Sequence, residues 1–278
     1  DYITQWSYGI DETWTLLIPN AKGGASVPLT QSEKAMEKAD NNFLPIYQQL
    51  GQYWGEQPGT SGPVYVGAFV MMLFILGLFI VKGPVKWALL AATILSIMLS
   101  WGKNFMGMTD FFIDYVPMYA KFRTVASILV IAEFTIPLLA MLALKKLMDE
   151  PELFKPRMKY VGISFLLTGG VAMLFSRMPS AFFDSFISSG ELKALQSLPA
   201  EYVQPVTANL TEMRQNVFTS DSLRSFYIIL VGTGILLAFM MGKLKKEYAV
   251  GIILVLCLVD LWTVNKRYLN DQMFVPKS

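Results

Sequence analysis

Apolar segments long enough to cross a lipid bilayer constrain this chain more than any other feature. The clearest is the segment 62–81, about 20 residues without a charged side chain, which is the length that a helix needs to span the hydrocarbon core. Composition agrees, because 54% of the 278 residues are hydrophobic and 16% are charged, whereas soluble domains carry about 25% charged residues. The sequence therefore predicts an all-α, polytopic membrane protein.

Five further apolar segments follow the first one. The second is bounded by Trp87 and Trp101, which suit the membrane–water interface. The third contains Glu133 and Pro137, and the last contains Asp260 near its far end. We expect about six transmembrane helices, over residues 62–81, 87–101, 124–144, 160–176, 225–241 and 248–264.

The basic residues indicate how these spans are oriented. The three short connections, 82–86, 145–159 and 242–247, hold ten of the 23 Lys and Arg residues, which places them in the cytoplasm by the positive-inside rule. The segment 1–61, the interfacial loop 102–123, the helical loop 177–224 and the tail 265–278 are then extracytoplasmic. A chain that begins outside without a signal-peptide pattern is predicted to be a fragment of a longer protein.

The lack of His and the presence of a single Cys exclude several kinds of catalytic and metal site. The chain has no His, which excludes Ser-His-Asp triads, His-based zinc sites and imidazole acid–base catalysis. Its one Cys, Cys257, lies in an apolar segment, so an intramolecular disulfide and Cys-rich metal sites are excluded. The net charge of +2 is too small for a nucleic-acid partner.

The outer segments carry helical patterns of their own. Residues 31–53 fit an amphipathic helix capped by Ser32. In the loop 102–123, charges alternate with aromatic residues, which is typical of a helix lying in the interface or of a re-entrant loop lining a polar cavity. Residues 177–224 predict one or two surface helices, the first with an apolar stripe around Phe182, Phe183 and Phe186.

Charged residues within the predicted spans are candidate site residues, because hydrocarbon penalises them. Glu133 precedes Pro137 by four residues, and it either faces a polar cavity or forms an interhelical ion pair or hydrogen bond. Asp260 lies about one turn from the outer end of its span and either reaches the interface or pairs with a neighbouring cation.

A group of cations lies at the outer end of the third span. Arg123 begins that span, and Lys121 and Lys103 are close to it in the sequence. Arg suits bidentate binding of a phosphate, and lipid phosphates lie at this depth. The alternative is that these residues are ordinary interfacial anchors.

Three outer carboxylates are further candidates. Asp110 and Asp114 are four residues apart, so a helix would place both on one face. Such a pair either holds a divalent metal or acts as a base, or it belongs to a solvated face. Glu12, next to Asp11, has the same alternatives.

Several short motifs resemble the bacterial YfhO-type membrane proteins. The similarity runs along nearly the whole chain. It rests on WSYGI at 6–10 with Glu12, LLIPN at 16–20, KGG at 22–24, YWG at 53–55 with QP at 57–58, GPVY at 62–65, LSWGKN at 99–104, KFR at 121–123, DLW at 260–262 and NKRYL at 265–269.

This resemblance implies an all-α glycosyltransferase of the GT-C type in the bacterial cytoplasmic membrane. Such an enzyme moves a sugar, with inversion, from a polyprenyl-phosphate donor to a cell-envelope polymer on the outer face. Its catalytic carboxylate is expected in an outer loop upstream of this chain, so the fragment is expected to be inactive alone. By their position and charge, we expect Arg123 and Lys103, together with Lys121, to contact the donor phosphate, and Glu133 and Glu12 to make polar contacts in the cavity.

Two other functions fit the composition. A transporter or flippase of lipid-linked precursors would place coupled charges near the membrane midplane, where Glu133 is the one candidate. A non-catalytic assembly subunit would need no charged vestibule. The expected partners are membrane lipid, a lipid-linked sugar and an envelope acceptor, with a divalent metal as a further candidate ligand.

Overall fold

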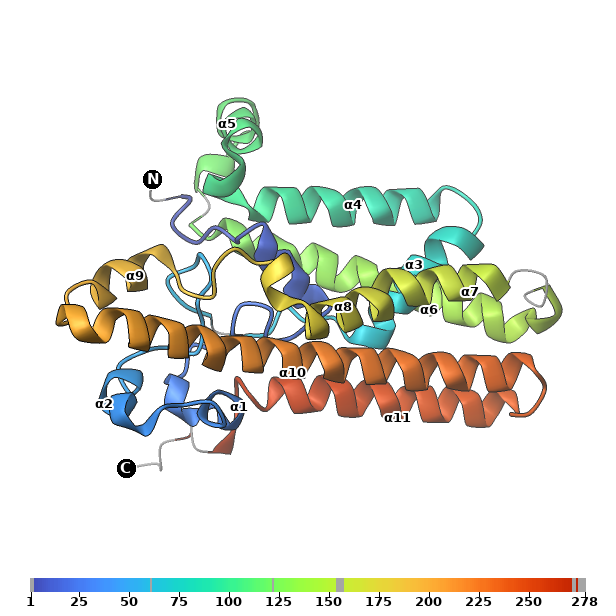
Figure 1. Ribbon diagram of the computed structural model, residues 1–278. Coiled ribbons are helices and arrows are strands. Elements are labelled where there is room, and N and C mark those ends of the chain that lie inside the picture. Colours follow the sequence, from blue (N-terminus) through green and yellow to red (C-terminus); the bar gives the residue numbers. More distant parts are fainter. Residues whose placement is uncertain (1–2, 61, 122, 154–157, 272–273, 275–278) are drawn as a thin grey trace.

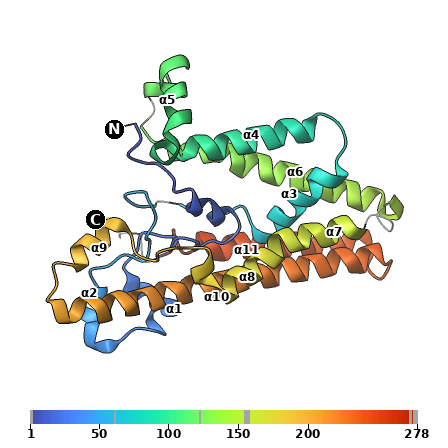
Figure 2. The same ribbon diagram turned by 45° about the horizontal axis from the view of Figure 1, so that its top comes forward.

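A computed structural model of the protein describes residues 3–60, 62–121, 123–153, 158–271 and 274. Helices form the regular structure of this described part, and it contains no β-strand. The long apolar helices lie side by side, and the irregular N-terminal segment gathers at one end of them (Figure 1). The described N-terminal segment and the end of the last helix lie at this same end, which we call the outer end (Figure 2).

The apolar helices follow the predicted spans. They are α3 (Ala68–Ile80), α4 (Val85–Ser100), α6 (Val130–Asp149), α7 (Met158–Phe165) with α8 (Val171–Arg177), α10 (Ala200–Met240) and α11 (Lys246–Asn265). In the described residues, four helical stretches are long and apolar enough to cross a membrane: Val125–Asp149, Met158–Arg177, Ala200–Met240 and Lys246–Asn265. A fifth exists if α4 and the helix after it form one bent span. These helices indicate a membrane protein, while the count of six spans remains a prediction.

The first predicted span contains a shorter helix than its apolar pattern indicates. Helix α3 has 13 residues and begins only at Ala68. Gly67 has a φ of +100°, which glycine adopts readily. An α-helix requires a negative φ, so the helix begins only after this residue. The Asp260 carboxylate and the Tyr65 hydroxyl oxygen accept hydrogen bonds from the Ala68 amide, at 3.2 and 2.7 Å, and so cap the helix start.

Helix α10 is one continuous helix of 41 residues, whereas the sequence predicts a span over 225–241 and separate surface helices before it. At 1.5 Å per residue it is about 60 Å long, twice the thickness of the hydrocarbon core. Its second half lies along α11 and α3 (Figure 1). Gly232 permits the close approach to α3, because a Cβ there would lie 2.2 Å from the Phe69 ring.

The first half of α10 supports a second, outer core. The short helices α1 (Glu33–Met36), α2 (Leu44–Tyr47) and α9 (Ser189–Leu195) pack beside it (Figure 1). The predicted amphipathic helix over 31–53 is thus broken into single turns, although Ser32 does cap α1. The apolar residues of this core include Leu29, Ala35, Tyr47, Ile187, Leu195, Val206, Leu210, Met213 and Val217.

The outer loop 102–123 contains the helix α5 (Met106–Tyr115). The chain turns by 109° between α4 and this segment, so α5 projects sideways from the outer end of the bundle (Figures 1 and 2). Phe111 and Tyr115 are exposed on it. The predicted apolar stripe around Phe182 differs from the structure, because residues 182–188 form a loop from which Phe183 and Phe186 enter the core.

Candidate functional site

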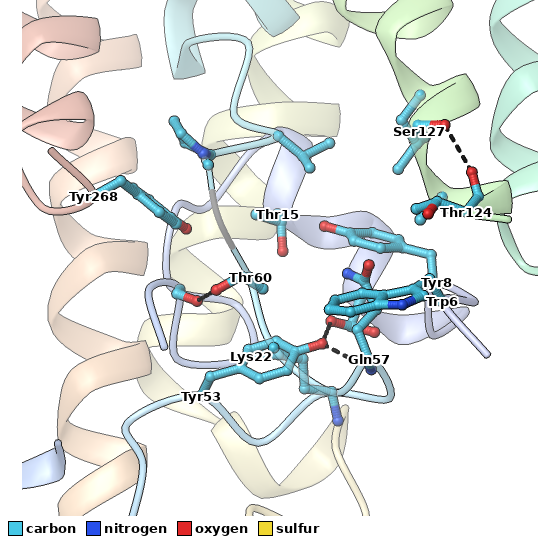
Figure 3. Close-up of a pocket in the computed structure, with 18 of the residues that line it drawn as sticks. Trp6, Tyr8, Thr15, Lys22, Tyr53, Gln57, Thr60, Thr124, Ser127 and Tyr268 are labelled. Atoms are coloured by element: carbon cyan, nitrogen blue, oxygen red, sulfur yellow. Dashed lines mark hydrogen bonds between the residues drawn. The ribbon is translucent and has the colours of Figure 1, made fainter. Parts of the chain in front are cut away.

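A polar cavity of about 580 Å³ lies at the outer end of the apolar helices. Its walls come from the N-terminal segment, the segment 53–64, the beginning of the third predicted span, and Tyr268 after α11 (Figure 3). The predicted site residues Glu12 and Glu133 both line it. Its other polar and aromatic residues are Trp6, Tyr8, Thr15, Lys22, Tyr53, Gln57, Thr60, Thr124, Ser127 and Tyr268.

Glu12 is the buried carboxylate of the cavity. Its Oε2 accepts hydrogen bonds from the backbone amides of Gly9, at 2.6 Å, and Glu56, at 3.1 Å. Its Oε1 accepts one from the Tyr53 hydroxyl. Burial nevertheless raises the pKa of Glu12, against the lowering effect of these donors. Glu12 therefore links the first helical turn of the chain to the segment that leads into α3.

The turn around Tyr53 fits closely against this carboxylate. A Cβ at Gly55 would lie 2.1 Å from Glu12 Oε1 and 2.3 Å from the Tyr53 hydroxyl. Only glycine leaves room for that hydrogen bond at this position. The Tyr53 hydroxyl also accepts a hydrogen bond from the Gln57 amide at 3.1 Å. The motif at 53–57 thus builds one wall of the cavity.

The segment around Tyr8 connects the cavity to two apolar helices. The Tyr8 amide donates to the Ser100 carbonyl at the end of α4, at 2.8 Å, and the Trp6 carbonyl accepts from Ala126, at 3.1 Å. Tyr8 is buried, and burial together with the negative charges of Glu12 and Glu133 raises its pKa. Both carboxylates therefore act on the same hydroxyl group.

Glu133 enters the cavity from the first turn of α6. A 3₁₀ segment, Val125–Leu129, precedes α6, so Glu133 lies near the outer end of the helix rather than at the middle of a span. The side chain is half-buried. In the part of the chain that the structure describes, no side chain or amide donates a hydrogen bond to it, and no cation pairs with it. The predicted interhelical pair is therefore not seen there, and Glu133 faces the cavity.

Lys22 is a cavity residue that we did not predict as part of a site. Its ammonium group forms an ion pair with Asp11 and lies 5.0 Å from the centre of the Phe183 ring. The KGG motif at 22–24 was the available signal, because Gly24 lines the cavity next to Lys22. Tyr268 approaches the same motif, and its hydroxyl would be 3.3 Å from a Cβ at Gly24.

The three predicted phosphate-binding cations lie outside this lining. The Lys103 ammonium is 3.5 Å from a Glu56 carboxylate oxygen and 3.3 Å from the Glu56 carbonyl. Lys121 and Arg123 are exposed, and Arg123 immediately precedes Thr124 in the cavity wall. The roles of these cations in binding phosphate remain predictions.

The remaining predicted carboxylates lie away from the cavity. Asp110 and Asp114 are both exposed on α5. Asp260 is buried, where it pairs with Arg224 at 2.7 Å and accepts a hydrogen bond from Tyr65 at 2.8 Å. This is the pairing that the sequence offered as one alternative for Asp260. Among the described residues, no group of three or more Asp, Glu or Cys could hold a metal ion.

A second, mostly apolar cavity of about 370 Å³ adjoins the first. The two cavities share Thr124, Ser127 and Val130 in their walls. The second is completed by Tyr119, Val125, Ile128 and Ile131. A polar space and an apolar space thus lie on two sides of the same short segment.

Comparisons with known proteins add no relative. No protein-family model, no curated protein and no solved structure matches the chain.

Proposed function

We propose that the chain is part of a bacterial cytoplasmic-membrane glycosyltransferase that uses a polyprenyl-phosphate-linked sugar on the outer face of the membrane. The observation that carries this proposal is the polar cavity at the outer ends of the apolar helices, with Glu12 and Glu133 in its walls. The enzyme class in this proposal comes from the motifs that resemble YfhO-type proteins, and residues of many of these motifs line the cavity. Both ends of the chain are extracytoplasmic in this proposal.

The two adjoining cavities suit an amphiphilic donor. The polar cavity offers carboxylate, hydroxyl and amide groups to a sugar. The apolar cavity on the other side of Thr124, Ser127 and Val130 offers aliphatic side chains to a polyprenyl chain. The exposed cations Lys121 and Arg123 are close in the sequence to the segment between them, where a donor phosphate would lie.

Within this proposal the chain supplies binding and orientation. Glu133 accepts hydrogen bonds from the substrate, because its carboxylate faces the cavity without a described donor. Glu12 maintains the shape of the wall through its three hydrogen bonds.

The experiment is an assay of sugar transfer by the full-length protein in nanodiscs, with polyprenyl-phosphate-linked sugars as donors. Glu133→Gln and Arg123→Ala should each lower the rate at least about tenfold, the expected loss for a charged hydrogen-bonding group. Glu201→Gln, an exposed carboxylate at the start of α10, is the matched control and should transfer at the normal rate. Normal transfer by Glu133→Gln would contradict the proposed site.

The orientation has its own test. Cysteines introduced at Lys82 and Lys193 are labelled with a membrane-impermeant reagent on intact cells. Lys193→Cys should react and Lys82→Cys should be protected, because α9 belongs to the outer core and Lys82 to a basic turn. The reverse pattern would overturn the orientation.

A further inference from the structure

The charges around the polar cavity are unbalanced. Lys22 is the cation in its described lining, and Asp11 already neutralises it. No described cation lies within ion-pair distance of Glu12 or Glu133. A cleft lined by one sign of charge attracts ligands of the opposite sign.

The two carboxylates differ in what they can offer a ligand. Glu12 already accepts hydrogen bonds from two backbone amides and from Tyr53. Glu133 accepts none from the described residues, so its acceptor capacity is open to the cavity. The buried Asn20 Oδ1 also lacks a described donor, and it lies directly behind Gly24 in the cavity wall.

Aromatic rings form much of the remaining wall. Trp6 and Tyr8 lie on one side of the cavity and Tyr268 on the other, with Tyr53 below them in the view of Figure 3. The faces of Trp and Tyr rings attract ammonium groups, and aromatic rings are used to bind ammonium ligands. A carboxylate pairs with the same positive charge. The cavity therefore has two features that favour a cation.

We propose that this cavity binds a ligand through a protonated amine, with Glu133 as the ion-pairing acceptor and Trp6 and Tyr8 as the neighbouring rings. A phosphate would meet two carboxylates here, so the donor phosphate binds outside this cavity. A metal ion is disfavoured, because the described residues provide no group of three ligands. The claim that the sugar acceptor carries an amine rests on the proposed function. The claim that the cavity binds an amine does not.

The test uses the full-length protein in nanodiscs and four soluble probes: glucosamine, ethanolamine, glucose and glucose 6-phosphate. Binding is followed as the rise in thermal unfolding midpoint with probe concentration. Glucosamine and ethanolamine should bind at least about tenfold more tightly than glucose, the order expected for one charged contact, and glucose 6-phosphate should bind most weakly. Tighter binding of glucosamine than of ethanolamine identifies an amino sugar; the reverse identifies an aminolipid head group.

Glu133→Gln should weaken amine binding at least about tenfold, while Glu201→Gln should leave it unchanged. Trp6→Leu should also weaken it, which keeps the test decisive if Glu133→Gln does not fold. Equal binding of glucose and glucosamine, tighter binding of glucose 6-phosphate, or competition by Mg²⁺ alone would each overturn the inference. Sugar transfer without amine binding contradicts only this inference, whereas amine binding without transfer contradicts only the proposed function.

Discussion

Two carboxylates on the outer side of the molecule, one half-buried and one buried, have opposite surroundings. Glu191 lies in the first turn of α9, and its two oxygens accept hydrogen bonds from the fully buried Arg214 guanidinium, at 2.6 and 2.9 Å. Glu12 is more deeply buried, and it has no described cation beside it. The first pair joins α9 to α10, whereas the second carboxylate faces a cavity.

The pKa values of Glu191 and Glu12 shift in opposite directions, because only Glu191 has a described cation beside it. Burial favours a raised pKa in both, but the hydrogen bonds and charge of Arg214 reverse the effect and lower the pKa of Glu191. Neutral donors do not reverse it for Glu12, whose pKa is raised. A buried charge beside a counter-ion depends on that partner for its stability, and one left without a counter-ion is a candidate for binding.

The largest effect is expected at the paired site. Arg214→Ala leaves the half-buried Glu191 without its cation and also removes the hydrogen bonds to the Phe186 and Gly51 carbonyls. The free energy of unfolding should fall by about 3–5 kcal/mol. Replacing both partners, as in Arg214→Met with Glu191→Leu, should restore much of it, and chemical unfolding measures both. A loss below about 1 kcal/mol would contradict the structural role.

Asp260 should behave like the paired site, with a smaller effect. Asp260→Ala removes the partner of Arg224 and Tyr65 and the cap of α3, so a loss of about 2 kcal/mol is expected. Asp114→Asn, which changes an exposed carboxylate on α5, is the control and should unfold like the parent protein. Amine binding should remain in Asp260→Ala at temperatures where it is folded.

Gly55 tests the shape of the cavity wall. Gly55→Ala places a methyl group 2.1 Å from Glu12 Oε1, which forces the carboxylate and Tyr53 apart. We expect a loss of about 1–2 kcal/mol in stability and a larger fractional loss of transfer. Gly107→Ala, where a Cβ meets no atom within 4 Å, is the matched control. Equal activities of the two variants would show that the Glu12 wall is not needed.

A still smaller effect is expected on the pH dependence of stability when Glu12 is replaced, and its sign can be stated. Its raised pKa means that ionisation costs folding free energy at neutral pH. Glu12→Gln can still accept from the two amides, so it should be more stable than the parent by up to about 1 kcal/mol at neutral pH. This gain should shrink as the pH falls through the raised pKa and vanish below the unfolded value of about 4.3. A gain that grows in acid would contradict the assignment.

The apolar helices could be predicted from the sequence because hydrocarbon imposes their length and composition. Residues 125–144 of the third predicted span and the whole segment 248–264, for example, fall within helical stretches of the structure. The continuity of α10 was not predicted, because its polar half has the pattern of a separate surface helix and contains Pro205, which normally ends or kinks a helix. Glu12 and Glu133 were predicted as polar cavity residues, and the structure brings them into one cavity.

Other parts of the site depend on contacts between distant segments. Lys22 is close to Asp11 in the sequence, but its place in the cavity depends on how the segments 1–24 and 53–64 pack. The pairing of Asp260 with Arg224 joins residues 36 positions apart on two helices. Local patterns identify such charges as costly without identifying their partners.

The most direct test of the account is Glu133→Gln in the full-length protein, measured for sugar transfer and thermal unfolding on the same preparation. The account predicts that transfer falls at least about tenfold while the unfolding midpoint does not fall, because no described residue donates a hydrogen bond to this carboxylate or pairs a cation with it. A lower midpoint with normal transfer per folded molecule would place Glu133 with Glu191 and Arg214 among the structural charges, and would contradict a functional cavity.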